Sequence, residues 1–218
     1  MDYGGDGPTA LLLHGLAGTA LEWEGTAAWL TETHRVVAPD QRGHGGSERR
    51  PPSVSAAELV EDVLAILAKL SLRRVTLIGQ SFGGQTAFLT AARRADLVRA
   101  LVVAEASPTP ATAQSVEELK GWLAEGSWPS FERDVAVRTL AETVGEDYWS
   151  EWESIRAPTL IVRGECGWLH EAEAEAMRAR LSGAGLLTVA GAGHDVHLEA
   201  PEGWRRAVEE FLRSIPPE

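Results

Sequence analysis

The stretch Gly79-Gln80-Ser81-Phe82-Gly83-Gly84 decides the expected fold of this chain of 218 residues. It follows an apolar run, Val75 to Ile78, and precedes a helix-like run, Gln85 to Arg94. A serine at the apex of a strand, tight turn and helix is typical of a nucleophile elbow, in which the strained backbone presents the hydroxyl. Glycines two residues before and after the serine let the chain fold back on itself. Taken alone, the six residues also fit a glycine-rich surface turn.

Composition limits the class of protein. The length suits one domain, and a hydrophobic fraction of 44% is enough for a substantial core. A net charge of −12 repels nucleic acid and anionic membranes, so we expect neither as a partner. Cys166 is the single cysteine, so no internal disulfide can form. Residues 1–8 lack the pattern of a secretory signal, and no apolar run is long enough to span a membrane, so we expect a cytoplasmic protein.

Short apolar runs alternate with helix-like runs along the chain. We expect strands at 9–13, 34–38, 75–80, 98–104, 159–162 and 186–189. We expect helices at 21–30, 55–70, 85–94, 171–181 and 201–215, the second of them opened by a capping box of Ser55 and Glu58. This alternation predicts an α/β fold with a doubly wound, mostly parallel sheet. In such a fold the chemistry lies at the carboxyl ends of the strands.

The segment 107–155 contains tryptophans but no convincing strand. We expect it to form a small helical cap on a core made of residues 1–106 and 156–218. Five tryptophans lie in this segment or just after the next strand: Trp122, Trp128, Trp149, Trp152 and Trp168. Together with His14 they predict an aromatic-walled pocket above Ser81, which favours an apolar or aromatic substrate. Ordinary helix packing is the alternative explanation for the same tryptophans.

Four motifs, in the same order along the chain, resemble those of the α/β-hydrolase superfamily, and in particular its serine esterases and lactonases with a short cap. They are His14-Gly15, Asp40-x-Arg42-Gly43-His44-Gly45-x-Ser47, the elbow 79–84, and Gly193-His194-x-x-His197-Leu198-Glu199-x-Pro201-Glu202. The resemblance covers nearly the whole chain and implies the α/β-hydrolase fold. It implies that Ser81 is the nucleophile and His194 its base. It also implies that the backbone amides of Leu16 and Phe82 form the oxyanion hole.

The same resemblance implies supporting roles for three other histidines. His14 and His44 belong to loops that shape the site and are expected to be scaffold rather than proton carriers. His197 is expected to pack at the start of the last helix. The six histidines do not share a helix face at metal-ligand spacing, so we expect no metal and no cofactor.

The acid that should orient His194 is the point at which the chain departs from the superfamily pattern. Gly167 and Trp168 occupy the place where an aspartate is expected. Glu105, directly after a strand, is the preferred substitute, because some branches of the superfamily take their acid from that position. Glu165 is the alternative. A third hypothesis is that no acid operates and the protein is slow or non-catalytic.

The N-terminal region departs from the pattern as well. The superfamily usually begins with two further strands before the His-Gly strand, but only residues 1–8 are available here. We therefore expect the first of these strands to be missing and the second to survive at most as a stub. The strand 34–38 would then be an exposed edge of the sheet. Exposed edges invite pairing, so a homodimer formed through this edge is one hypothesis.

These observations predict a serine hydrolase that cleaves small apolar or aromatic carboxylic esters or lactones through an acyl-enzyme. A carbon–carbon bond hydrolase or lyase on the same scaffold is an alternative, because the same serine and oxyanion hole serve that chemistry. A degenerate, non-catalytic ligand-binding homologue is another. The missing aspartate and the shortened N-terminus motivate this last hypothesis.

Overall fold

A seven-stranded sheet forms the centre of the protein in a computed structural model that describes residues 1–216. The strands are β1 (Asp2–Gly4), β2 (Thr9–Leu13), β3 (Arg35–Val37), β4 (Val75–Gln80), β5 (Val98–Ala104), β6 (Thr159–Gly164) and β7 (Gly185–Val189). Their order across the sheet is β1-β3-β2-β4-β5-β6-β7. All neighbouring strands pair in parallel except β1, which runs antiparallel to β3. The predicted mostly parallel α/β sheet is therefore confirmed.

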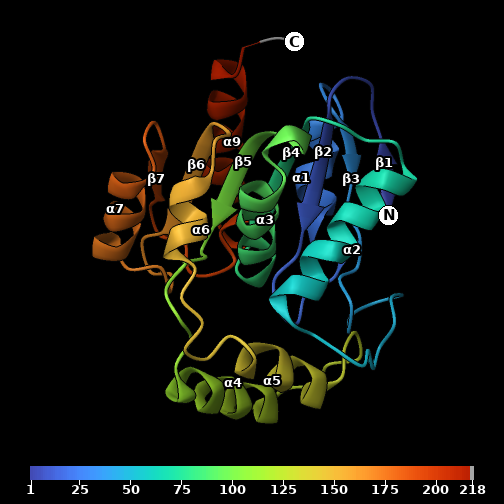
Figure 1. Cartoon of the computed structure of the whole chain (residues 1–218), viewed down its shortest axis with the longest axis vertical. Helices are drawn as coiled ribbons and strands as arrows, with labels where there is room; N and C mark the ends of the chain where they lie inside the picture. The colour runs from blue at the N-terminus through green and yellow to red at the C-terminus, as the bar shows by residue number, and fades with distance from the viewer. Residues whose placement is uncertain (217–218) are drawn as a thin grey trace.

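Helices cover both faces of this sheet (Figure 1). The helices are η1 (Ala20–Trp23), α1 (Glu24–Leu30), α2 (Ala56–Lys69), α3 (Phe82–Arg93), η2 (Ala95–Leu97), α4 (Ala113–Glu125), α5 (Arg133–Ala141), α6 (Trp149–Ser154), α7 (Glu171–Arg180), α8 (Val196–Glu199) and α9 (Pro201–Ser214), with η denoting a 3₁₀ turn. Within residues 1–216, none of the helices combines the length and the apolar character that crossing a lipid bilayer requires.

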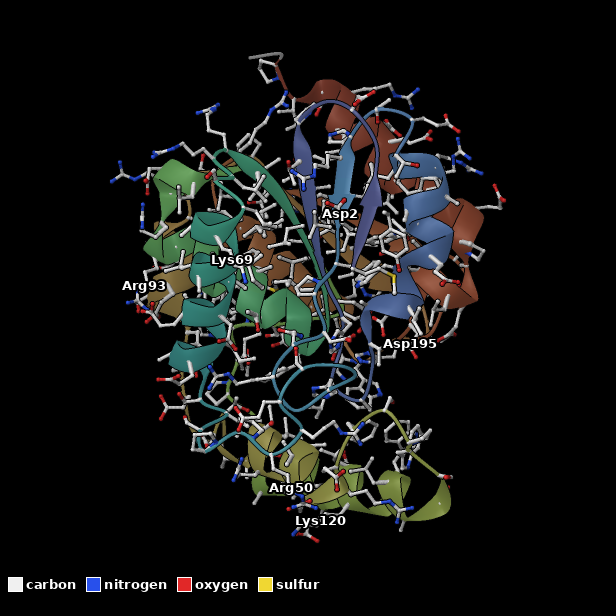
Figure 2. The ribbon with its side chains drawn as sticks, turned by 90° about the vertical axis from the view of Figure 1, so that its right-hand side faces the viewer. Asp2, Arg50, Lys69, Arg93, Lys120 and Asp195 are labelled. Atoms are coloured by element: carbon white, nitrogen blue, oxygen red, sulfur yellow. The ribbon has the colours of Figure 1, made fainter. Side chains whose placement is uncertain are left out.

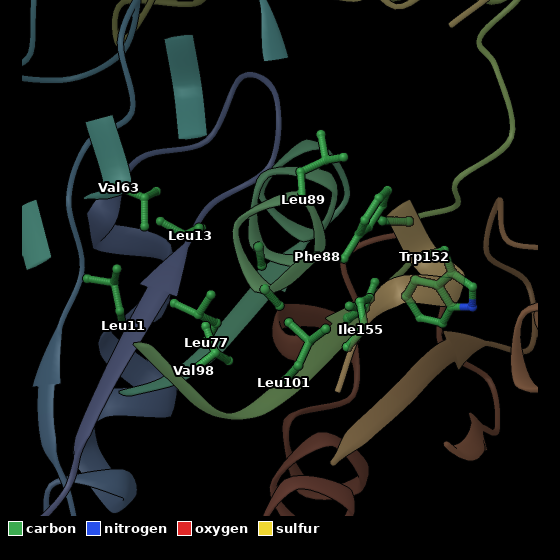
Figure 3. Close-up of a cluster of buried hydrophobic side chains, with 14 of the residues drawn as sticks. Leu11, Leu13, Val63, Leu77, Phe88, Leu89, Val98, Leu101, Trp152 and Ile155 are labelled. Carbon is green, nitrogen blue, oxygen red and sulfur yellow. The ribbon is translucent and has the colours of Figure 1, made fainter. Parts of the chain in front are cut away.

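The strands are apolar on both sides because both sides are covered. Along β2, Leu11 and Leu13 pack into a core with side chains from α2, α3, α6 and α7, whereas Ala10 and Leu12 pack with η1, α1 and α9 on the opposite face. All four side chains are fully buried. Figure 3 shows the first of these cores, with Phe88 of α3 between the sheet and α6.

Helix α2 shows how the local sequence builds one of these layers. The Ser55 side chain caps its first turn by accepting the Glu58 N–H at 3.4 Å. The Glu58 carboxylate pairs with Arg42 at 3.2 Å instead of turning back to the backbone of Ser55, so only half of the predicted capping box forms. Its apolar stripe, which includes Val63 and Leu67, is buried in the core that faces β2.

The N-terminal edge of the sheet differs from the expectation. The short strand β1 pairs with β3, with Asp2 opposite Val37 and Gly4 opposite Val36. Strand β3 therefore lies between β1 and β2, and the prediction that it forms an exposed edge is wrong. The argument for a homodimer through β3 is therefore removed, because the edge of β3 is already paired with β1.

The expected cap, residues 107–155, contains helices that pack in two different places. Helices α4 and α5 lie beyond the carboxyl ends of the strands (Figure 1), and they share a small apolar cluster around Leu123 and Phe131. Helix α6 instead contributes Trp152 and its flanking Ile155 to the core over α3 and β5. The part of the segment that overhangs the sheet is thus α4 and α5.

Candidate active site

Ser81 sits in a strained turn between β4 and α3. Its backbone adopts φ 52° and ψ −120°, a region that non-glycine residues rarely occupy, and its N–H donates to the Ala104 carbonyl at 2.7 Å. A Cβ on Gly79 would overlap the backbone of Gly83, and a Cβ on Gly83 would overlap the carbonyl of Leu13. These close approaches explain why the elbow requires glycine at both positions. The serine side chain is half-buried at the end of the sheet that faces α4 and α5.

The carboxylate of Glu105 reaches the imidazole of His194. Glu105 directly follows β5 with φ 50°, and its Oε2 lies 3.3 Å from His194 Nδ1. The side chain is fully buried, and it accepts backbone N–H groups from Gly164 at 2.7 Å, Trp168 at 2.6 Å and Leu169 at 3.1 Å. These three amides compensate the carboxylate for its lost hydration. A carboxylate facing Nδ1 favours the tautomer in which Nε2 is free to accept a proton.

Gly167 explains how a glutamate from β5 can occupy this place. A Cβ at residue 167 would overlap both carboxylate oxygens of Glu105. The position at which an aspartate was expected is therefore the space that Glu105 fills. The carboxylate of Glu165 points elsewhere and accepts the N–H of Gly191 at 2.8 Å. The structure brings Glu105, and not Glu165, to His194.

Gln80 is a site residue that the sequence reasoning missed. Its side-chain Nε2 donates to the His194 carbonyl at 3.0 Å and to Asp195 Oδ1 at 3.1 Å, and the residue is 1% exposed. It therefore ties the loop that carries His194 to the residue preceding Ser81. Figure 2 shows Asp195 at the end of the core that faces α4 and α5. The sequence did offer a signal. Gln80 is a polar residue at the end of an apolar strand that proves fully buried, and a buried polar side chain needs a hydrogen-bond partner.

The predicted oxyanion amides lie on two elements next to Ser81. Phe82 is the first residue of α3, so its N–H has no intrahelical acceptor. Leu16 lies in the loop after β2, and the next residue, Ala17, has φ 73° and donates its N–H to His44 Nε2 at 3.2 Å. The buried His44 imidazole thus holds the loop that carries the Leu16 amide.

His14 lies behind the site and does not line it. Its side chain is completely buried, so its prediction as a pocket residue is wrong. Its Nε2 accepts the Gln41 N–H at 2.8 Å, which places the ring proton on Nδ1, 2.8 Å from the Gly15 carbonyl. Burial lowers the pKa of His14 to about 3, and burial also lowers the pKa of His44. The imidazole of His14 is therefore neutral, with a hydrogen bond at each ring nitrogen, and we interpret it as part of the scaffold.

Three of the five predicted pocket tryptophans lie at the cap end of the molecule or beside His194. The indole of Trp168 stacks on the imidazole of His194, with ring centroids 4.3 Å apart and planes inclined by 25°. Trp122 and Trp128 contact each other at a centroid separation of 4.1 Å. Trp128 also contacts Phe131, whose ring lies 5.6 Å from that of His44, so aromatic contacts run from Trp122 of α4 to His44, which binds the loop after β2.

The other two tryptophans belong to the core. Trp152 is fully buried, packs edge-on against Phe88 and donates its indole N–H to the Met177 carbonyl at 2.9 Å (Figure 3). Trp149 packs partly buried against the same core, with the Arg180 guanidinium 4.3 Å from its ring centroid. Their prediction as walls of the pocket is therefore wrong. The prediction failed because the same tryptophan side chains would suit a short helix that packs on the sheet and one that lines a pocket.

Two cavities lie away from these residues. One of about 270 Å³ lies between α1 and α9, with Trp29 and His197 in its wall. The other, of about 330 Å³, lies beneath α2 beside Arg42 and Lys69. Neither is lined by Ser81. Across residues 1–216, no three histidine, cysteine, aspartate or glutamate side chains are grouped so as to hold a metal ion.

Comparisons with known proteins agree with the fold. A family model described as alpha/beta hydrolase fold matches residues 8–147, so the chain belongs to the α/β-hydrolase fold family. Among curated relatives, the chain is 27% identical to a 2-(acetamidomethylene)succinate hydrolase of Mesorhizobium japonicum, with 95% of this chain and 89% of that protein covered. It is 28% identical to an esterase of Mycobacterium tuberculosis, with 98% and 84% covered.

The fold also superposes on solved structures. An enol-lactonase from Burkholderia xenovorans matches with a TM-score of 0.83 at 20% identity, and the match covers 96% of this chain and 93% of that one. At this identity the likeness shows the fold. The family and its named relatives support a hydrolase on the α/β scaffold.

Proposed function

We propose that this chain is a serine hydrolase that cleaves small, uncharged carboxylic esters or lactones. The observation that carries the proposal is the contact between the buried Glu105 carboxylate and His194 Nδ1 at 3.3 Å, beside a serine held at φ 52°. A serine hydroxyl is a poor nucleophile unless a base takes its proton, and the base needs an acid to fix its tautomer. The three groups supply these functions from three separate strand ends.

The reaction follows from these roles. The Ser81 hydroxyl oxygen attacks the ester carbonyl carbon while His194 Nε2 takes the hydroxyl proton. The N–H groups of Leu16 and Phe82 donate to the oxyanion that forms, and the protonated His194 then gives its proton to the departing alkoxide. Water then attacks the acyl-enzyme while His194 Nε2 takes its proton. As the acyl–oxygen bond breaks, His194 returns this proton to the Ser81 oxygen, which releases the acid and restores the hydroxyl. Glu105 stabilises the imidazolium in both halves of the cycle.

The charge around the site supports an uncharged substrate. The basic residues nearest to the site motifs along the chain are engaged elsewhere. Arg42 pairs with Asp62 at 2.6 Å, and the buried Arg163 donates to the Leu169 carbonyl at 2.8 Å. The overall charge of −12 also repels anions. An apolar or aromatic acyl group fits the indole that stacks on His194.

The nucleophile is tested with p-nitrophenyl acetate and butyrate. We expect Ser81→Ala to lose hydrolysis to the background rate with an unchanged circular dichroism spectrum, because the attacking oxygen is gone. Ser150→Ala, which removes an exposed hydroxyl on α6, is the matched control and should retain the wild-type rate. A folded wild-type protein that neither turns over these esters nor reacts with a fluorophosphonate probe would instead support a non-catalytic binding protein.

The acid is tested by comparing two glutamates. We expect Glu105→Gln to lower kcat by about 10³- to 10⁴-fold, because an amide no longer stabilises the imidazolium. Glu165→Gln should stay within about twofold of wild type, since its carboxylate accepts only the Gly191 N–H in this loop. Equal losses in both variants, or a larger loss in Glu165→Gln, contradicts the assignment. Urea unfolding of each variant separates a catalytic effect from a loss of stability.

Hydrolysis of a different bond on the same scaffold, in a charged dicarboxylate or between two carbon atoms, is the second candidate reaction. The relative from Mesorhizobium japonicum is named for hydrolysis of a succinate derivative that carries an acetamidomethylene group, and it is 27% identical over most of both chains. A panel of p-nitrophenyl esters, lactones, 2-(acetamidomethylene)succinate and a β-diketone separates the reactions. Preference for the uncharged esters or lactones supports the first proposal, and preference for a diketone or the dicarboxylate overturns it.

A further inference from the structure

Trp168 is unusually exposed for a tryptophan. The residue is 70% exposed, yet its ring is held in a nearly parallel stack on His194 at 4.3 Å. Tryptophan side chains bury large areas when they serve only to stabilise a fold. This one leaves most of its surface in water and covers one face of an imidazole whose own side chain is 22% exposed.

The backbone of the same residue holds the acid. The Trp168 N–H donates to Glu105 Oε2 at 2.6 Å, and Oε2 is also the atom that lies 3.3 Å from His194 Nδ1. Residue 168 therefore contacts both members of the pair, with its amide on the carboxylate and its ring on the imidazole. The ring closes one face of His194 while the carboxylate fixes its edge, and together they restrict rotation of the imidazole.

The stack has a different strength in the two protonation states of His194. An aromatic face attracts a cation, and tryptophan does so more strongly than tyrosine or phenylalanine. The indole thus favours imidazolium over neutral imidazole. Imidazolium is the state that forms when the base takes the serine proton, so the interaction strengthens as the reaction proceeds.

We propose that Trp168 is a positioning residue that orients His194 and stabilises its protonated form during catalysis. This inference rests on the proposed function, which supplies the role of His194 as the base. The indole acts on the imidazole only, and no bond to Trp168 forms or breaks.

Other ionisable groups around His194 are carboxylates and one thiol. They are Glu105 at the end of β5, Glu165 and Cys166 in the turn after β6, and Asp195 and Glu199 in the loop and helix after β7. Replacing the Trp168 ring leaves all of them in place, because residue 168 binds Glu105 through its backbone N–H.

The kinetic test compares Trp168→Leu with the conservative Trp168→Phe. We expect Trp168→Leu to lower kcat about three- to tenfold with KM within twofold. The acid limb of the pH profile of kcat/KM should move to lower pH by about 0.4–0.7 unit, because the protonated base has lost its aromatic partner. Trp168→Phe should recover most of both effects. Trp149→Leu, which removes an indole that stacks on Arg180 away from the site, is the matched control and should leave the profile unchanged.

A fluorescence titration tests the stack without any turnover. A protonated imidazole quenches an indole that it contacts, so the difference in emission between wild type and Trp168→Phe should titrate with pH. We expect the same titration in a Ser81→Ala background and its loss in a His194→Ala background. This titration does not depend on turnover. If the protein proved inactive but the titration were still present, the proposed reaction would be wrong while the contact between Trp168 and His194 would stand. Absence of the titration, or a Trp168→Leu profile that matches wild type, overturns the role of Trp168.

Discussion

Gly167 and Glu105 form a matched pair at the scale of single residues. The carboxylate of Glu105 occupies the volume that a side chain at residue 167 would need. Four donors then converge on this one carboxylate: the amides of Gly164, Trp168 and Leu169, and His194 Nδ1. A glutamate from the neighbouring strand end thus reaches the imidazole because the usual position carries no side chain.

Adding a single methyl group should therefore impair this arrangement. We predict that Gly167→Ala lowers kcat by about 10- to 100-fold, since displacing a catalytic group by about 1 Å costs up to this much. Steady-state kinetics with p-nitrophenyl butyrate measures the effect. Gly121→Ala on α4 is the control, because a Cβ there meets no atom within 4 Å. That control should keep wild-type kinetics, and a Gly167→Ala variant with wild-type kcat contradicts the pairing.

The sequence indicates the candidate residues of the site better than it indicates how they fit together. Ser81 and His194 stand in local motifs, and Glu105 was the preferred acid because some branches of the superfamily take their acid from the end of that strand; the structure brings its carboxylate to His194. The importance of Gly167 could not be predicted, because it depends on the group that faces this glycine in the fold, the carboxylate of Glu105, which is 61 intervening residues away in the sequence. The contacts of Gln80 and Trp168 with His194 could not be predicted either, because they join residues that are far apart in the sequence.

At the scale of elements, the buried strands were predictable and the edges were not. The expected strands 9–13, 75–80 and 98–104 match β2, β4 and β5 residue for residue, because each is a short apolar run bounded by polar or turn residues. Strand β1, in contrast, is Asp-Tyr-Gly, which carries no apolar pattern and is held by pairing with β3. Helix α6 carries two tryptophans in six residues, and its sequence does not distinguish the core from a cap.

The placement of α6 predicts that its tryptophan serves stability rather than catalysis. Trp152→Ala should lower the free energy of unfolding by about 3–5 kcal/mol, because it empties a fully buried site and removes the bond to Met177. Trp152→Phe, which keeps part of the volume, should lose less and remain folded if the alanine variant does not. Urea unfolding measures the loss, and KM for p-nitrophenyl butyrate should stay within twofold. A raised KM with unchanged stability would show that Trp152 contacts the substrate and not the core.

The helices α4 and α5, which were expected to belong to a cap, should respond in the opposite way. Trp128 packs beside Phe131, and its indole N–H donates to the Leu123 carbonyl at 3.0 Å, so it orders these two helices rather than the core. We predict that Trp128→Ala raises KM for aromatic esters several-fold, because the cap faces the end of the sheet that carries Ser81. The midpoint of thermal unfolding should fall less than in Trp152→Ala. Unchanged KM values across a series of acyl groups would show that the cap does not contact the substrate.

At the scale of the whole molecule, buried histidines make stability depend on pH. Burial lowers the pKa of His14 to about 3, and burial also lowers the pKa values of His34 and His44. A histidine in the unfolded chain titrates near pH 6.5. Below that pH the unfolded chain therefore binds protons that the folded chain does not bind. The contribution of these histidines to folding stability is therefore fully present above about pH 6.5 and is lost as the pH falls below that value. Each histidine that stays neutral in the fold contributes a slope of at most about 1.4 kcal/mol per pH unit in this window.

His14→Gln isolates the largest of these contributions. Glutamine has N–H donors and a carbonyl acceptor that can replace the bonds of the neutral imidazole to Gly15 and Gln41, but it does not titrate. We predict that the variant is less stable than wild type at pH 7 and that its stability falls less steeply between pH 6.5 and 4, by about 1 kcal/mol per pH unit. Urea unfolding at half-unit steps measures both slopes. His170→Gln, which replaces an exposed imidazole, is the control and should keep the wild-type slope. Equal slopes in wild type and His14→Gln would show that folding does not change the protonation of His14.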